Sequence, residues 1–445
     1  MDSMQSRLEK QVDILFHNVA GWEQNALRRI GRRIRQIKSL SKADLQAINN
    51  SAIVKQDIDE IFKELARLSG QNAKEVQRVY AEMIDSQHQE NKVLYDYRNK
   101  KYIPFEDNKH LQAIVKAYAK TTAETMINLS MSKARNIGFI DINNRFVPLE
   151  TNYTRVLDKA VMSIATGTGD FNTEMRSVLK ELGGSGLRVN YGGGITRRLD
   201  SMVRQNLLWG AKQASVEYNE MIGEELGCDG IEIDWHSNPR PSHEFMQGKL
   251  YSLKGKKTIK GITYESADKA LEALNDYGCL HFKTPVMLGV SEPRYSEEEL
   301  KRLNAENSKQ IEIDGVYKTG YEWKQTMRRL ELEARKTHGQ IDILKASGDN
   351  IGVKQLKTKL RVIEDKYKDI ADKTGMKPQW QRMSVVKGKT IDKSAKSGII
   401  NTKISFGNVV NPMDKQKYAR IKKGLEKNGI KTVVAQGDDL SYLKL

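Results

Sequence analysis

Apolar residues recur at three- and four-residue intervals over most of this 445-residue chain, and this periodicity limits the fold more than any other feature. It begins with Val12, Phe16 and Val19, inside a stretch from about 8 to 87. Such spacing places apolar side chains on one face of an α-helix. The alternating segment Ile231–Trp235 predicts a strand. The expected fold class is therefore α+β and mainly α, with further helices over 111–131, 153–165, 197–225 and, joined at 347–350, within 321–375.

Four regions of the chain differ in pattern and composition. They are predicted to be an N-terminal helical region (1–182), a central mixed domain with a Pro/His/Cys loop knot (183–320), a long basic helical hairpin or coiled-coil arm (321–385), and a small α/β C-terminal extension (386–445). In the extension, residues 414–428 are expected to form a helix and residues 431–435 a strand. One helix and a strand or two bury little apolar surface alone.

Two kinds of signal interrupt the helical patterns. Ser41 and Asp44 have the spacing of a helix start, in which a serine caps the helix and an acid follows three residues later. Two glycine-rich segments lie at 183–186 and 191–194. Neither is followed by Gly-Lys-Ser/Thr, and neither has the spacing of a dinucleotide fingerprint. We expect flexible or closely approached loops there.

Positive charge is concentrated in the last third of the chain. There are 74 Lys and Arg against 57 Asp and Glu, a net charge of +17. Residues 321–445 contain 28 basic and 14 acidic residues and so carry +14 of this charge. Such a field favours a polyanion as partner, for example double-stranded DNA bound without sequence preference. A solvated basic helix pair is an equally good interpretation.

A second basic stretch lies near the N-terminus. Its arginines share one face of a predicted helix and are Arg28, Arg29, Arg32, Arg33 and Arg35. This face either contacts phosphate or is simply solvated, and for a single basic helix we favour the solvated face.

The chain has few features of an exported or membrane protein. Two cysteines in 445 residues suit a reducing compartment during synthesis. The sequence shows no apolar signal core and no apolar run of membrane-spanning length. We expect synthesis in a cytoplasm and no membrane partner.

Rare side chains gather between Trp235 and Gly289. This stretch holds three of the seven histidines and one of the two cysteines, and Cys228 lies just upstream. Imidazole and thiol groups bind metals or relay protons at neutral pH. One hypothesis is a tetrahedral zinc site, with Cys228 as a further candidate and with the ligands His236, His243, Cys279 and His281. The spacing is weaker than that of a zinc finger, so no cofactor is expected unless this set binds zinc.

Two other hypotheses fit the same stretch. One is a metal-dependent or Cys/His enzyme centred on 228–289. The Cys/His version would use Cys279 as nucleophile, His243 or His281 as base, and Arg240 to hold an oxyanion, but no third orienting residue is evident. The alternative that we favour is a structural loop knot, because buried histidines and thiols are commonly held by hydrogen bonds alone. Either a zinc site or a knot predicts that the side chains of Arg240, His243, Cys279 and His281 lie close together.

Three charged residues precede this stretch at helical spacing. Arg197, Asp200 and Arg204 are three and four residues apart, which places them on one face of the predicted 197–225 helix. There they pair with one another or reach a neighbouring element, and a buried set of this kind more often fixes a fold than performs chemistry.

Short motifs in a fixed order give the chain a family resemblance. They are Arg197-Arg198-Leu199-Asp200, Val203-Arg204-x-Asn206, Arg240-Pro241-Ser242-His243, Gln247-Gly248-Lys249, Gly278-Cys279-x-His281, and Pro285 with Gly289. This series resembles the phage minor capsid protein 2 family of tailed phages and prophages, which is related to the Mu F-like, or head morphogenesis, group. The resemblance covers most of Met1 to about Val386. Leu280 departs from it, because the family commonly has arginine at that position.

The resemblance implies a minor structural protein of the phage head and not an enzyme. Its expected partners are the portal protein, capsid or scaffold proteins, and double-stranded DNA, in head assembly and in DNA packaging or ejection. Its expected location is the head interior of the virion, after assembly in the host cytoplasm. The residues carried over as a structural motif are Arg197, Asp200, Arg204, Arg240, Ser242, His243, Gln247, Gly248, Cys279, His281 and Pro285.

Overall fold

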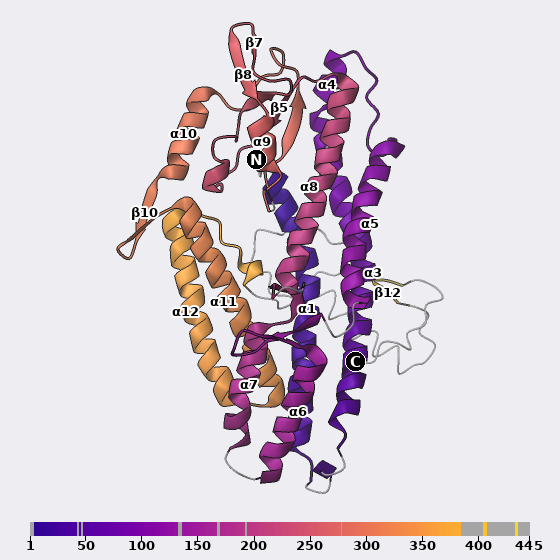
Figure 1. Cartoon of the computed structure of the whole chain (residues 1–445), viewed down its shortest axis with the longest axis vertical. Helices are drawn as coiled ribbons and strands as arrows, with labels where there is room; N and C mark the ends of the chain where they lie inside the picture. The colour runs from indigo at the N-terminus through magenta and orange to yellow at the C-terminus, as the bar shows by residue number, and fades with distance from the viewer. Residues whose placement is uncertain are drawn as a thin grey trace. The chain divides into compact units, whose positions relative to one another are not determined.

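The computed structural model divides the chain into two compact units, Met1–Lys387 and Gly388–Leu445. The residues that it describes are 4–41, 44–45, 48–131, 136–166, 170–191, 194–276, 278–383, 404–406 and 432–434. Figure 1 shows the course of the chain through these elements. Each unit is described by itself below.

Helices make up most of the first unit, as the apolar periodicity predicts. They are α1 (Met4–Lys38), α3 (Asn50–Glu90), α4 (Lys92–Tyr97), α5 (Lys109–Met131), α6 (Leu149–Thr166), α7 (Phe171–Ser185), α8 (Leu199–Leu226), α9 (Asp268–Leu274), α10 (Glu297–Ser308), α11 (Gly320–Ser347) and α12 (Asn350–Thr374), with short 3-10 turns at η2 (Pro241–His243) and η3 (Trp380–Arg382). Small sheets lie between them, so the predicted class, α+β and mainly α, is confirmed.

Three sheets are described in the first unit. A four-stranded sheet has the order β2-β1-β3-β4 and consists of β1 (Ile137–Ile140), β2 (Phe146–Pro148), β3 (Arg188–Asn190) and β4 (Thr196–Arg198). A five-stranded sheet has the order β7-β8-β6-β5-β9 and consists of β5 (Gly230–Ile233), β6 (Leu250–Ser252), β7 (Lys257–Ile259), β8 (Ile262–Ser266) and β9 (Lys283–Val286). A hairpin of β10 (Gln310–Ile313) and β11 (Val316–Thr319) leads into α11. The predicted strand at 231–235 is β5.

The helical core is organised around α1. Its apolar stripe, which includes Val12, Val19 and Ile30, is buried, and α1 packs against α3, α6, α8 and α11. Burial of this stripe is the main favourable contribution, at roughly 25 cal/mol per Å² of apolar surface. Trp22 of α1 also donates from Nε1 to the carbonyl of Ile61 on α3, at 2.7 Å. The long N-terminal helices are therefore held by each other and not by helix propensity alone.

Ser41 and Asp44 form the helix start that their spacing predicts. The Ser41 hydroxyl donates to Asp44 Oδ2 at 2.6 Å, and the backbone N–H of Asp44 donates to Ser41 Oγ at 3.2 Å. These bonds satisfy polar groups where α1 has ended and before α3 begins.

Three arginines on the basic face of α1 form ion pairs with acids of neighbouring helices. Arg33 pairs through Nε with buried Asp57 of α3 at 2.8 Å, and Arg28 pairs with Asp342 of α11 at 3.2 Å. Arg29 also pairs with Asp57, at 3.3 Å. The solvated-face prediction is therefore wrong for these three arginines, because acids on neighbouring helices reach them. Arg32 and Arg35 are exposed.

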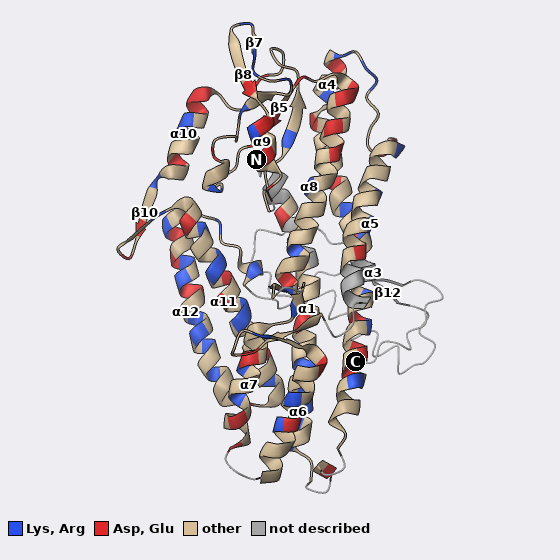
Figure 2. Ribbon diagram, viewed as in Figure 1, with Lys and Arg blue, Asp and Glu red and all other residues tan. Residues whose placement is uncertain are grey.

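Helices α11 and α12 form the predicted hairpin, and Lys and Arg recur along both (Figure 2). The hairpin packs along its α11 side against α1 and α7, so it does not project as an isolated arm. Its turn is fixed by Asp349, which accepts from the N–H of Gly352 at 3.0 Å and from Arg176 of α7 at 2.5 and 2.9 Å. The turn is thereby tied to the helical body.

The first glycine-rich segment is not the predicted loop. Gly183 lies inside the last turn of α7 and meets Gly339 of α11 backbone to backbone. A Cβ added at Gly339 would lie 2.3 Å from the Gly183 carbonyl oxygen. The expectation of close approach is correct, but its purpose is helix packing and not a flexible connection.

In the second unit the structure describes two short strands, β12 (Ile404–Phe406) and β13 (Thr432–Val434), which pair in parallel. The strand β13 confirms the strand predicted at 431–435. The helix predicted at 414–428 lies outside the described residues. None of the described helices is long and apolar enough to cross a membrane.

Candidate functional site

Strand pairing in the five-stranded sheet brings together the two halves of the His/Cys-bearing stretch. β5 and β9 are antiparallel neighbours, and Ile233 at the end of β5 pairs with Lys283 at the start of β9. The pairing continues one residue further, since the N–H of Asp234 donates to the Phe282 carbonyl at 3.1 Å and the N–H of Phe282 donates to Asp234 Oδ1 at 2.7 Å. The loop that leaves β5 and the loop that enters β9 therefore lie at the same end of these two neighbouring strands.

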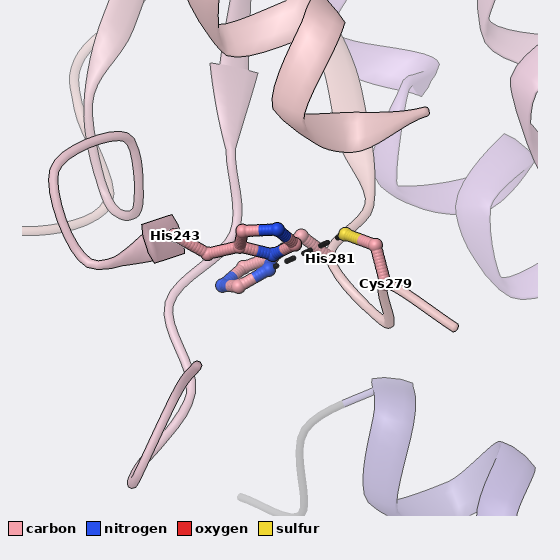
Figure 3. A group of neighbouring side chains, drawn as sticks. All are labelled: His243, Cys279 and His281. Atoms are coloured by element: carbon pink, nitrogen blue, oxygen red, sulfur yellow. Dashed lines mark hydrogen bonds between the residues drawn. The ribbon is translucent and has the colours of Figure 1, made fainter. Parts of the chain in front are cut away.

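Three side chains from these loops meet and are called the His/Cys cluster here: His243, Cys279 and His281 (Figure 3). All three are buried, and their possible ligand atoms lie within 4.8 Å of one another. Cys279 Sγ is 3.7 Å from His281 Nδ1, and His243 Nε2 is 3.0 Å from Asp276 Oδ2. Arg240 reaches the same carboxylate at 3.5 Å. The side chains predicted to lie together do so.

Two imidazoles of this region, those of His236 and His281, are held in the neutral form by burial. Burial lowers the pKa of His281 to about 2 and that of His236 to about 4. The two rings stack, with 4.2 Å between their centroids. The buried Gln247 amide lies beside His281 Nε2 at 3.3 Å, and it can also donate to the His236 carbonyl at 3.2 Å and accept from Trp235 Nε1 at 3.1 Å. This amide joins the neighbouring loop segments.

A buried lysine holds the second loop, which enters β9, by hydrogen bonds to its backbone. Lys212 of α8 donates to the carbonyls of Leu274 at 2.5 Å and Cys279 at 3.1 Å. Burial lowers the pKa of Lys212. An ammonium that satisfies two buried carbonyls fixes the backbone on both sides of the turn before Cys279.

The other predicted motif residues shape the loops and do not join the cluster. Gly248 has φ +72°, and a Cβ there would lie 2.3 Å from Leu300, so only glycine fits. Pro285 lies on β9 opposite Ile231. Ser242 is exposed on η2.

The arrangement offers a metal three of the four predicted ligands. His243, Cys279 and His281 form a mixed N/S set of the kind that zinc binds. His236 does not belong to this set, because it faces His281 by stacking. Cys228 does not belong to it either; it lies at the end of α8, where burial raises the pKa of its thiol to about 11. The zinc hypothesis is therefore reduced to three protein ligands, His243, Cys279 and His281.

The Cys/His enzyme hypothesis is weakened by the same geometry. His281 is the imidazole next to Cys279, and burial lowers the pKa of its ring, which disfavours proton transfer from the thiol to it. Arg240, the residue predicted to hold an oxyanion, pairs with the half-exposed Asp276 at 3.5 Å. The knot of hydrogen bonds accounts for the contacts without chemistry.

The charged residues before the sheet are not arranged on one helical face as predicted. α8 begins at Leu199, so Arg197 lies on β4, where its guanidinium donates to Gln205 at 3.2 Å. Asp200 is buried and pairs with Arg198 at 3.3 Å and with Arg335 of α11 at 3.2 Å. The side chain that takes the predicted role of Arg197 is therefore Arg198, one residue later.

These pairs form one of two buried ion-pair clusters, which are connected by a hydrogen bond from Arg335 Nη1 to the Arg382 carbonyl at 2.7 Å. The two clusters together are called the ion-pair network and join α1, β4, α8, α11 and η3. Arg204 of α8 pairs with Asp13 of α1 at 2.8 Å, and Arg382 of η3 pairs with Glu9 at 2.9 Å and with Asp13 at 3.3 Å. Arg198 also reaches Glu23 at 3.2 Å. The members of the network are Glu9, Asp13, Glu23, Arg198, Asp200, Arg204, Arg335 and Arg382.

Most members of this network were not predicted. The available signal was on α1, where Asp13 and Glu23 directly follow the apolar residues Val12 and Trp22 and so border the buried face. Acids at such positions need buried cations, which the sequence does not identify. The protonation states follow from the surroundings. Burial would raise the pKa of Asp200, but Arg198 and Arg335 lower it to about 2, whereas burial raises the pKa of Glu23 to about 7.

The fold and site define a class of protein: a large α+β, mainly α protein whose helical body contains buried ion pairs and carries a small sheet with a hydrogen-bonded loop pair. The family model described as phage minor capsid protein 2 matches residues 4–372. The chain therefore belongs to the phage minor capsid protein 2 family, which supports a structural role in a phage head and a location in the virion. No curated protein and no solved structure matches it.

Replacing Asp200 with asparagine tests the ion-pair network. The change removes the carboxylate that pairs with both Arg198 and Arg335. Because Arg198 keeps Glu23, which can ionise in place of Asp200, we expect the free energy of unfolding to fall by about 3 kcal/mol, near the lower end for a broken buried pair. Below pH 4 the unfolded wild-type chain takes up a proton that folded Asp200 takes up only near 2. Its stability therefore falls as the pH drops from about 4 to 2, and Asp200→Asn should lose this part of the slope.

Denaturant unfolding at several pH values measures both effects. The control is Glu265→Gln, which breaks the exposed pair with Lys256 and should cost less than about 1 kcal/mol. Equal costs for the two variants would contradict the assigned role of the network.

Metal analysis of the purified full chain separates the zinc hypothesis from the hydrogen-bonded knot. A zinc site predicts about one equivalent, lost in Cys279→Ala and His281→Ala together with part of the thermal stability, because metal binding and folding are coupled. Cys228→Ala is the matched control and should keep the metal. If the wild-type chain takes up no zinc from a zinc-containing buffer, the zinc hypothesis is wrong and only the hydrogen-bonded knot remains.

Proposed function

We propose that this chain is a minor structural protein of a tailed-phage or prophage head that associates with the portal protein and with capsid or scaffold proteins. In this proposal it is made in the host cytoplasm, is enclosed in the head interior, and acts in head assembly and in DNA packaging or ejection. The observation that carries the proposal is the family match over 4–372, which spans almost the whole of the unit Met1–Lys387. The matched region and the compact unit thus coincide.

The interior of the fold supports a scaffolding role. The ion-pair network joins Glu9 to Arg382, so the first helix and the last described turn of the unit hold each other. The loops of the five-stranded sheet are held by buried bonds such as those from Lys212. A body closed in this way presents a defined surface to partners, which a ring of portal subunits requires.

Mass spectrometry of purified virions tests this proposal. Phage particles produced by a lysogen that carries the gene should contain the chain in low copy number, and chemical cross-linking should connect it to the portal protein. The control is the same preparation from a strain with the gene deleted. Heads that contain portal but lack this chain would overturn the proposal.

We also propose that the positively charged residues after 321, including exposed basic side chains of α12, contact packaged DNA. Residues 321–383 contain 15 basic and 9 acidic residues, and residues 384–445 contain 13 and 5. On α12 several basic side chains are exposed and form no ion pair with a described residue: Lys354, Lys357, Arg361, Lys366 and Lys368. Cations without partners of this kind release counterions when they meet phosphate.

Binding of the full chain to duplex DNA should fall steeply with salt and be independent of sequence. Each phosphate contact contributes a slope of about −0.9 in a plot of log affinity against log salt. Replacing Lys354, Lys357 and Arg361 by glutamine should lower the slope, and ending the chain after Lys387 should lower it further. Three substitutions of paired cations, Arg78, Lys256 and Lys373, provide the control. A salt-independent affinity would contradict DNA contact.

A further inference from the structure

A cavity of about 230 Å³ lies beside the His/Cys cluster, between the two loops and α11. Arg240 comes from the first loop, Cys279 from the second, and Tyr321, Lys324 and Arg328 from α11. Among the described residues that line the cavity, none is an aspartate or a glutamate. A concave site bordered by three cations and no acid concentrates positive potential.

Two of these cations form no close ion pair with a described residue, although the Glu9 carboxylate attracts both at longer range. Lys324 and Arg328 are four residues apart on α11 and thus lie on the same side of the helix, and neither forms an ion pair with a described residue. Burial and the neighbouring Arg328 lower the pKa of Lys324 to about 8. The third cation, Arg240, has only the half-exposed Asp276, which it shares with His243.

The adjoining cavity shows the contrasting arrangement. It has a volume of about 290 Å³ and shares Arg328, Cys279 and Leu280 with the first. Its other arginines include Arg204 and Arg382, each paired with an acid of α1. Arg328, at the boundary of both cavities, forms no close ion pair with a described residue, and Glu9 and Glu331 act on it only at longer range. The close pairs with acids of α1 therefore lie on the side of the adjoining cavity.

We propose that the first cavity binds a phosphate-sized oxyanion, held by Arg328, Lys324 and Arg240. A guanidinium offers two parallel N–H donors to a phosphate, and an ammonium adds a point charge. A tetrahedral anion presents oxygens in several directions, which matches cations that approach from a loop and from a helix better than a planar carboxylate does. Tyr321 and Gln325 provide neutral donors on the same wall.

This proposal does not depend on the head location, and its ligand chemistry is shared by inorganic phosphate and by a phosphomonoester such as a nucleotide. Lys324 and Arg328 are predicted to be dispensable for folding, because burial and neighbouring cations, which lower the pKa of both groups, outweigh the attraction of Glu9. Their variants therefore test binding directly. The neutral His236 and His281 keep the adjoining wall from adding further charge.

Calorimetric titration of the full chain with inorganic phosphate at low ionic strength is the test. The expected result is one saturable site whose affinity falls about tenfold or more in Lys324→Gln and in Arg328→Gln, the loss typical of one hydrogen bond to a charged group. Lys357→Gln on α12 is the control and should bind as the wild type does, since Lys357 does not line the cavity. Unchanged melting temperatures would show that both variants fold.

Equal phosphate affinity in all four chains, or no saturable binding to the wild type, would overturn the proposal. Titration with a 5′-mononucleotide identifies the source: competition with phosphate that needs Lys324 and Arg328 supports a phosphomonoester ligand, and failure to compete supports the free ion. Duplex DNA binding measured on the same variants should be unchanged, which separates this site from the basic surface of α12.

Discussion

Buried charge that must be paired is the constraint on which this fold depends. Asp13 and Glu23 are buried on α1 and Glu9 is partly buried, and an isolated buried carboxylate is strongly unfavourable. Their partners come from three other parts of the chain, so α1 is stable only where β4, α8 and η3 surround it. Buried pairs of this kind contribute little net stability compared with apolar residues. What they supply is selectivity, because a shifted helix leaves charges unpaired.

Much of the architecture could be predicted because it follows from local pattern. The apolar spacing of α1 and of the α11–α12 hairpin is sufficient to identify helices. The partners of charged residues are different, because they depend on tertiary contacts. Arg197 and Arg198 look alike in sequence, but the start of α8 at Leu199 puts one on an exposed strand position and buries the other. Gly183 gave the correct signal of close approach without its cause, since Gly339 is far away in sequence.

Most residues of the candidate site could be predicted from the sequence, but the role of each residue could not. Rare residue types indicated which side chains gather, and the pairing of β5 with β9 explains how they meet. His236 could not be separated from the ligands by spacing, since stacking on His281 is a matter of ring orientation. Lys212 and Lys324 are ordinary lysines on helices, and only the loops packed against them make one a backbone support and the other an unpaired charge. The site thus combines a neutral, rigid wall with a cationic one.

The pairing of Glu9 with Arg382 also has a consequence for the time at which the protein can fold. These residues are separated by 373 positions, so the ribosome releases the arginine long after the acid. At a synthesis rate of about 5–20 residues per second, the delay is on the order of tens of seconds. During that interval α1 has an apolar stripe and acids whose partner in η3 does not yet exist. The native arrangement of the first helix is therefore among the last to be completed, and the body closes only when nearly the whole unit has left the ribosome.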